Sequence, residues 1–296
     1  MVTPPFLARP VALPVLAKLV VKGTTSASRL WLARRMTGML ADALPGRDIH
    51  AVADAAYAGK ELRLLSPRVA WTTRLRKDAA LHDLPPARTG RRGRPPVKGA
   101  RLPSLARLAG RADFAPVTVT RYGKTGTIEA AAITRLWYSV FGTRPVTVVL
   151  IRDRSGSGYD LALVTNEPAA SPARVIERYA SRWSIEAAIE DAKQIFGTGQ
   201  ARNRTAGAVR RTVPFQLACQ TLAMTWYATA GYHPADIDGH RQRAPWYATK
   251  TRPSTADMLA RLRRVLIAAK YQPSRPDQPA PEEIHAIRLA WEDTAA

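Results

Sequence analysis

Five side chains able to bind metal ions or phosphates recur at helical spacing between positions 179 and 193: Tyr179, Arg182, Glu186, Glu190 and Lys193. Each residue of an α-helix advances by about 100°, so the five fall within an arc of roughly 80°. Carboxylate oxygens bind hard divalent cations, and nearby arginine and lysine side chains hold phosphates. The spacing alone is equally typical of a solvated helix face with ion pairs such as Arg182–Glu186.

A second candidate metal ligand is Asp54. It ends a run of small and β-branched residues, 48–54, that predicts a short strand. Carboxylates at the carboxyl ends of strands in open α/β sheets point into the ligand crevice. An aspartate in front of Ala-Ala-Tyr is equally suited to cap the next helical turn, and the residues alone leave both roles open.

The composition points to a polyanionic partner. Lysine and arginine number 45 against 23 aspartates and glutamates, a formal net charge of +22. This excess favours nucleic acid, with a general basic RNA-binding protein as a weaker reading. The single cysteine, Cys219, excludes a disulfide scaffold and a cysteine-based zinc cluster. The apolar stretch 11–21 is short and interrupted by Pro14 and Lys18, so we expect no membrane span and a cytoplasmic location.

Alternating helix and strand patterns predict an α/β fold. In the first half of the chain we expect a helix over 26–44, strands over 48–54 and 68–75, a helical stretch over 60–65, and an exposed, basic, Pro/Gly-rich loop over 76–104. From residue 116 strands follow, with a turn at Lys124-Thr-Gly and a hairpin joining 146–153 to 159–167. The second half predicts helices from Ser171 to about 193–196, over about 205–230 and over 254–270, with a loose tail from 272.

The basic loop contains Arg92-Gly-Arg94-Pro, which is similar to the core of minor-groove AT-hooks. Narrow A·T grooves attract inserted arginine, and a plain phosphate-binding or solvated loop is the alternative. Trp183 and Trp137 are candidates to stack on a base, although core packing is the favoured role for Trp183.

The spacing Y-(2)-R-(3)-E-(6)-K at Tyr179, Arg182, Glu186 and Lys193 resembles the Y-R-E-K signature of DDE insertion-sequence transposases. The segment Ala51-Val-Ala-Asp-Ala-Ala-Tyr57 is similar to that family's second-aspartate strand and the helix after it. The resemblance covers roughly residues 10–230. It implies a DNA transposase catalytic domain that cleaves DNA and transfers strands in a metal-dependent reaction.

The resemblance further implies a ribonuclease H-like mixed sheet with a β-rich insertion, in which carboxylates hold Mg²⁺ or Mn²⁺. Asp54 and Glu186 would be metal-binding catalytic residues, whereas Arg182, Lys193 and Tyr179 would contact DNA. The partners it implies are double-stranded transposon ends and target DNA, with a homodimer expected by analogy and no small-molecule substrate. A bacterial, nucleoid-associated location follows.

The family's first aspartate has no counterpart on a predicted strand. Residues 1–41 contain neither Asp nor Glu, and the earliest acids are Asp42 and Asp48. We therefore expect a sheet that is incomplete at the amino-terminal end and a polypeptide that is inactive alone. The competing hypothesis is a catalytically dead DNA-binding remnant or regulator derived from a transposase.

The expected organisation has four parts. Residues 1–78 and 171–232 are expected to form the two parts of the catalytic core, which contain Asp54 and Glu186 respectively. Residues 79–170 are expected to form the basic loop and strand insertion, and residues 233–296 a basic helical region with its tail.

Overall fold

The structure is a computed structural model that describes residues 1–20, 28–87, 93–152, 158–167, 169–246, 249–270 and 280–293. The chain divides into two compact units. The sheet unit comprises Val20–Trp183, and the helical unit comprises Met1–Leu19 together with Ser184–Ala296.

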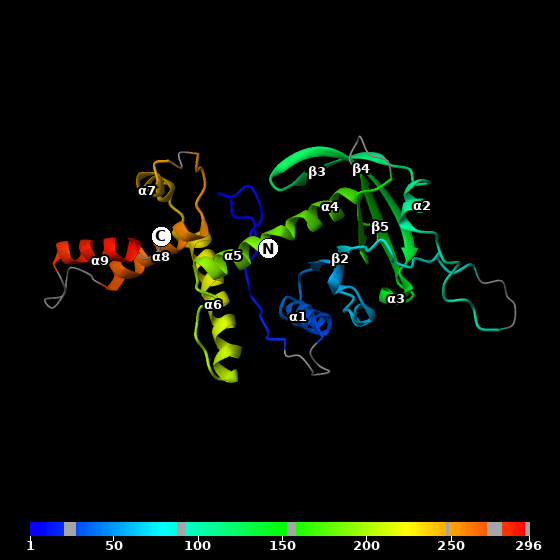
Figure 1. The fold of residues 1–296 in the computed structure, drawn as a ribbon, viewed down its shortest axis with the longest axis horizontal. Helices are drawn as coiled ribbons and strands as arrows, with labels where there is room; N and C mark the ends of the chain where they lie inside the picture. The colour runs from blue at the N-terminus through cyan, green and yellow to red at the C-terminus, as the bar shows by residue number, and fades with distance from the viewer. Residues whose placement is uncertain are drawn as a thin grey trace. The chain divides into compact units, whose positions relative to one another are not determined.

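The sheet unit is built on a six-stranded sheet in the order β1-β2-β6-β5-β4-β3 (Figure 1). Its strands are β1 Ile49–Ala53, β2 Val69–Arg74, β3 Ala115–Arg121, β4 Lys124–Leu136, β5 Pro145–Arg152 and β6 Leu161–Thr165. β1 and β2 are parallel, whereas the other neighbouring strands are antiparallel. The expected α/β class is confirmed, and the specifically ribonuclease H-like arrangement stays a prediction.

Apolar side chains fill both faces of this sheet. Along β5, Val148 and Leu150 join the core on one face, and Val149 and Ile151 join the core on the other. Successive side chains of a strand point to opposite faces, so a strand covered on both sides reads as one apolar run. This accounts for the uninterrupted Val-Thr-Val-Val-Leu-Ile sequence of β5.

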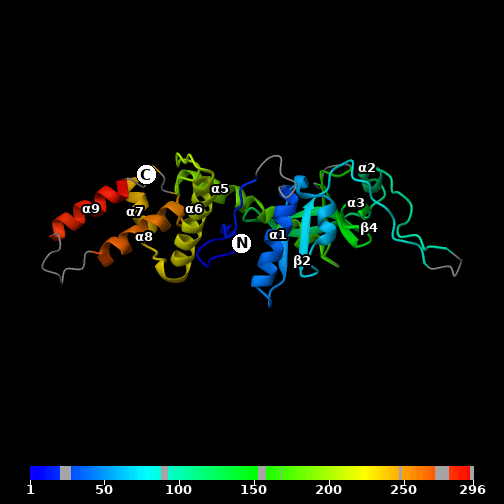
Figure 2. The same cartoon turned by 90° about the horizontal axis from the view of Figure 1, so that it is seen from below.

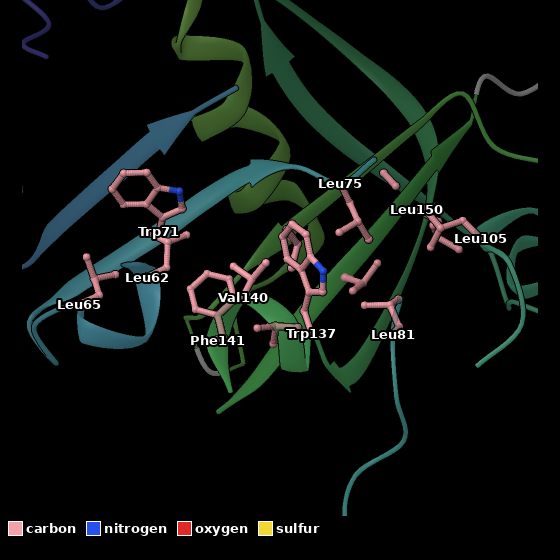
Figure 3. Close-up of a cluster of buried hydrophobic side chains, with 14 of the residues drawn as sticks. Leu62, Leu65, Trp71, Leu75, Leu81, Leu105, Trp137, Val140, Phe141 and Leu150 are labelled. Atoms are coloured by element: carbon pink, nitrogen blue, oxygen red, sulfur yellow. The ribbon is translucent and has the colours of Figure 1, made fainter. Parts of the chain in front are cut away.

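Helices cover the two faces. The first face packs against α1 Arg29–Ala43, α2 Leu105–Ala109, α3 Tyr138–Phe141 and the 3₁₀ helix η3 Lys60–Leu64, with Trp71 and Trp137 among the buried side chains of the cluster (Figure 3). Helix α4, Pro172–Ser181, covers the second face through Val175 and Ile176. The helical stretch expected over 60–65 is the 3₁₀ helix η3, and a further 3₁₀ turn, η2, spans Ala55–Tyr57.

The β3–β4 hairpin turns two residues earlier than the sequence predicts. Tyr122 and Gly123 have φ of 53° and 78°, and Lys124 already pairs with Arg121. Positive φ at both central residues matches the right-handed twist of a tight hairpin. The expected turn at Lys124-Thr-Gly was therefore wrong, because Tyr122 accepts a left-handed backbone that sequence rules assign first to glycine or asparagine.

The basic segment 76–104 is anchored to the sheet, contrary to its interpretation as a wholly exposed loop. His82 and Leu136 exchange two backbone hydrogen bonds of 2.9 Å each, so the segment's first arm continues the sheet beside β4. The amide of Gly99 donates to the carbonyl of Asp83 at 2.9 Å, and Leu81 is only 1% exposed. The described parts of the segment, cyan in both views, extend away from the sheet (Figures 1 and 2).

Glycine is required at position 99, where the returning part of the segment, 99–102, lies beside residues 81–83. A Cβ atom at this position would lie 2.6 Å from the carbonyl oxygen of Leu84 and 2.8 Å from Cβ of Asp83. We expect Gly99→Ala to lower the free energy of unfolding by about 1–3 kcal/mol through overpacking. Gly38→Ala in α1 is the control: nothing lies within 4 Å of its Cβ, and alanine there should stabilise by about 0.5–1 kcal/mol. Equal effects in urea unfolding of the two variants would contradict the close approach.

The helical unit contains α5 to α9. Their bounds are α5 Trp183–Gln194, α6 Ala206–Trp226, α7 Asp236–Arg243, α8 Thr255–Lys270 and α9 Pro281–Asp293, with a π-helical turn, η4, over Tyr227–Gly231. The expected helix over 254–270 is confirmed. The loose tail was wrong for 281–293, where Pro281 begins a helix and Glu283 accepts from the amide of Ala280 at 2.9 Å, as in a capping box.

A small core and the Asp236–Arg264 ion pair help to hold the helical unit together. Tyr227 and Met258 pack against Phe6 of the amino-terminal segment. Next to this core, Asp236 accepts from the Tyr227 hydroxyl at 3.0 Å and from Arg264 at 2.8 Å. Within the described residues, no helix combines the length and apolar character that crossing a membrane requires.

Candidate functional site

Asp54 lies at the carboxyl end of β1, as the sequence predicts, and its side chain is exposed. One carboxylate oxygen accepts from the amide of Ala56 at 2.8 Å, which caps the 3₁₀ turn η2. The Asp54 carbonyl accepts from the Thr73 hydroxyl of β2 at 2.7 Å, which ties the end of β1 to its neighbour. The capping role therefore uses one carboxylate oxygen of a side chain that is exposed.

The two earlier acids lie at the other end of β1. Asp42 is in the last turn of α1, and Asp48 directly precedes β1; both are exposed. A strand rises about 3.3 Å per residue, so the six positions from Asp48 to Asp54 span roughly 20 Å. Asp48 therefore does not share a cation with Asp54.

The long helix predicted from Ser171 is interrupted at Arg182, between α4 and α5. Ser171 caps α4 by accepting from the amide of Arg174, as predicted for a Ser-Pro start. Tyr179 lies in the last turns of α4 and packs partly against the core on its face of the sheet. The Arg182 guanidinium lies 5.7 Å from the centre of the Tyr179 ring, so these two signature residues are in cation–π contact.

Glu186 and Lys193 lie at the two ends of α5. Glu186 is half-buried in the first turn, where the helix dipole stabilises a carboxylate, and Lys193 is exposed in the last turn. Seven residues of helix separate them by about 10 Å along one face.

The other two acids of α5 have structural partners. Exposed Glu190 accepts a hydrogen bond from Gln194, whereas Asp191 accepts one from Thr255 of α8 at 2.5 Å. Burial and the charge of Glu190 raise the pKa of Asp191. The Asp191 side chain joins α5 to α8 through its hydrogen bond with Thr255.

Glu167, to which the sequence assigned no role, is the centre of an ion-pair cluster after β6. It is bonded to Arg178 of α4 and lies 3.6 Å from both Arg174 and His50 Nδ1. Partial burial alone would raise the pKa of Glu167, but the hydrogen bond and the charge of Arg178 hold this pKa below its ordinary value. Because β6 is antiparallel to β2, the cluster lies at the end of the sheet opposite Asp54. It anchors α4, and through α4 it positions Tyr179 and Arg182.

The remaining candidates divide between surface, core and undescribed residues. Arg94 is exposed on the basic segment, whereas Arg92 lies outside the described residues. Trp137 is a core residue of the sheet unit. Trp183 is 53% exposed, so the favoured core role was wrong, because it opens α5 on the side turned to solvent.

The acids present supply the right donor type for a divalent cation but not a complete ligand set. Asp54 and Glu186 offer the carboxylate oxygens that Mg²⁺ prefers, and Mg²⁺ is often held by one or two carboxylates. Across the described residues, however, no three His, Cys, Asp or Glu side chains are grouped to hold a metal ion. The donor type therefore suits a divalent cation, whereas the described residues show no group of three ligands for a pair of metals.

A family model described as a transposase DDE domain matches residues 12–221, more than half of the chain. The matched region contains Asp54 and the whole stretch from Tyr179 to Lys193. No curated protein matches the sequence.

Proposed function

The chain belongs to the transposase DDE domain family, and from that premise we propose that it acts on DNA phosphodiester bonds during transposition. The observation that carries the proposal is the complete Tyr179, Arg182, Glu186, Lys193 spacing within the matched region. The net charge of +22 supports a nucleic-acid partner independently of the signature. We propose double-stranded transposon ends and target DNA as the partners, bound by a homodimer at the nucleoid.

The signature residues divide into phosphate ligands and metal ligands. Arg182 and Lys193 hold phosphates near the reacting bond, and the Tyr179 ring orients the Arg182 guanidinium through the 5.7 Å contact. Asp54 and Glu186 bind a divalent cation, which domains of this family generally use. When bound, Mg²⁺ or Mn²⁺ activates the attacking oxygen and stabilises the charge that develops on the phosphate.

We propose that these 296 residues, on their own, are not competent for cleavage or strand transfer. Asp48 and Asp42 lie at the wrong end of β1 to serve as a third ligand beside Asp54. Two carboxylates balance the charge of paired metals less well than three, so binding of the second metal is weak. The alternative, a DNA-binding regulator derived from a transposase, is favoured by the same observation and differs in having no cation bound by Asp54 and Glu186.

The roles of Arg182 and Lys193 are tested by the salt dependence of DNA binding. Removing one phosphate contact lowers the slope of log K against log salt by about 1. We expect Arg182→Ala and Lys193→Ala each to show this loss, measured by fluorescence anisotropy with a transposon-end duplex. Arg111→Ala, which removes an exposed arginine just after α2, is the charge-matched control and should lower the slope by much less. Identical slopes for all three variants would remove both signature cations from the DNA interface.

A further inference from the structure

A cluster of cations surrounds Tyr138 at the start of α3, in the sheet unit and apart from the signature residues. The Lys98 ammonium lies 4.9 Å from the centre of the Tyr138 ring, and the Arg63 guanidinium lies 5.6 Å from it. Arg63 comes from η3 and Lys98 from the returning arm of the basic segment. The half-buried ring therefore holds two exposed cations from distant parts of the sequence in one place.

These cations are bonded to neutral groups. Arg63 donates to the carbonyl oxygen of Tyr138 at 2.8 Å, and Lys98 donates to Nε2 of His82 at 3.2 Å. Arg144 donates to the carbonyls of Arg63 and Leu65 at 2.9 and 3.3 Å. Burial, followed by the charges of Lys98 and Arg101, lowers the pKa of His82, as expected in a region of positive potential.

Within the described part of the chain, the cations of the cluster have no carboxylate partner. Asp83, the neighbour of His82, is paired with Arg135 at 3.4 Å. Among the described residues, neither Arg63, Lys98 nor Arg144 has a carboxylate oxygen within ion-pair distance. Holding like charges together costs free energy unless an anion binds between them. Their carbonyl and aromatic contacts fix the two cations in place without satisfying their charge.

We propose that the Tyr138 cluster, which consists of Arg63 and Lys98 at the Tyr138 ring and of Arg144 bonded to the Arg63 carbonyl, binds the phosphodiester backbone of double-stranded DNA at a point separate from the signature residues. The proposal rests on the proposed function for the nature of the polyanion. Lys98 lies four residues after Arg94, so the cluster is at the base of the exposed basic segment. Arg94 and Lys98 are both exposed, so this arm and the cluster together offer several cations to a duplex. Phosphate contacts of this kind position a protein on DNA without reading its sequence.

The test compares Lys98→Ala with Lys124→Ala, which has the same charge change. Lys124 begins β4 at the hairpin tip, whereas Tyr138 follows the other end of this strand. The 13 residues of β4 measure about 40 Å along the strand. We expect Lys98→Ala to weaken binding of a transposon-end duplex about 3- to 10-fold near 0.15 M salt and to lower the salt slope by about 1. Lys124→Ala should leave both nearly unchanged. Thermal unfolding of each variant checks that the fold is intact.

A second readout uses the unaltered protein. Acylation of lysines by a water-soluble ester, followed by peptide mass spectrometry, should show Lys98 protected at least about 3-fold by duplex DNA and Lys124 unprotected. Inorganic phosphate at the same phosphate concentration should give no protection, because a single free anion lacks the many contacts of a duplex. Protection by inorganic phosphate alone would replace the DNA site by a free-anion site.

The outcomes separate the two proposals. If the unaltered protein binds DNA but Lys98→Ala and Lys124→Ala behave alike and Lys98 stays reactive, the Tyr138 cluster is not a DNA contact, and the proposed function stands. If the unaltered protein binds no DNA at all, the result contradicts the proposed function and, with it, the proposal for the Tyr138 cluster.

Discussion

A polypeptide of these 296 residues is expected to bind transposon-end DNA and to leave its phosphodiester bonds intact in Mg²⁺ or Mn²⁺. Removing one member of a cooperating catalytic set lowers rates by about 10⁴-fold or more in well-studied enzymes. Among the described residues, no three His, Cys, Asp or Glu side chains are grouped to hold a metal ion. We therefore expect cleavage of a labelled end duplex at least about 10⁴-fold below that of a DDE transposase with all three acids.

The matched controls for this result are Asp54→Asn and Glu186→Gln. Neither should change the background rate, because the unaltered polypeptide has no metal-dependent rate to lose. If the unaltered polypeptide cuts the duplex and both variants abolish the cut, the assignment of Asp54 and Glu186 holds but the proposed inactivity is wrong. If it cuts and neither variant has an effect, the catalytic assignment fails as well.

The largest effect on stability is expected at Asp257. Its side chain, 4% exposed, pairs with Lys250, 6% exposed, at 2.5 Å. It also accepts from the amide of Ser254 at 2.7 Å and caps the start of α8. Breaking a buried ion pair leaves an uncompensated charge, so Asp257→Ala should lower the free energy of unfolding by about 3–5 kcal/mol.

Two further variants separate the buried charge from other causes. Asp238→Ala breaks the exposed Asp238–Arg241 pair of 3.3 Å and should cost less than about 1 kcal/mol. Adding Lys250→Met to Asp257→Ala removes the buried charge that has lost its partner. The double variant should recover part of the lost free energy of unfolding. If Asp257→Ala and Asp238→Ala cost the same in chemical unfolding, the Lys250–Asp257 pair is not a buried ion pair in solution.

The same pair predicts a pH dependence. Burial alone would raise the pKa of Asp257, but the hydrogen bonds from Lys250 and Ser254 outweigh it and hold the pKa below 3.8. A carboxyl whose folded pKa is depressed stabilises the fold above its unfolded pKa, and this stability is lost as the pH falls through the folded value. The difference between the unaltered protein and Asp257→Ala should therefore be full at pH 7 and shrink as the pH falls below about 3.8.

Local patterns predicted the elements well where one residue type decides the structure. The strand before Asp54 and the cap at Ser171 were found because β-branched periodicity and Ser-Pro have direct local causes. The turn at Tyr122 was missed because a non-glycine residue adopts positive φ there. Helix α9 was missed because Pro-rich composition around 272–280 hid a capped, amphipathic segment from 281.

For the candidate site, sequence spacing indicated which residues to consider but not the contacts that anchor them. Tyr179 and Arg182 were placed on one face by helical periodicity, and their ring–cation contact agrees with that placement. The Glu167–Arg178 pair that fixes α4, and the Tyr138 cluster, join residues from 11 to 81 positions apart. Such contacts depend on strand order, which no local pattern encodes. The arrangement of Asp54 relative to Glu186 also stays a prediction.

The measurement that tests the central claim most directly is iron-mediated cleavage of the polypeptide itself. Fe²⁺ replaces Mg²⁺ in the DNA-bound protein, and ascorbate with peroxide generates hydroxyl radicals that cut the backbone next to the bound metal. If Asp54 and Glu186 bind the same cation, fragments should end near both residues, and Asp54→Asn should remove both cuts together. Cuts near only one of the two, or cuts that survive Asp54→Asn, would contradict a shared metal site.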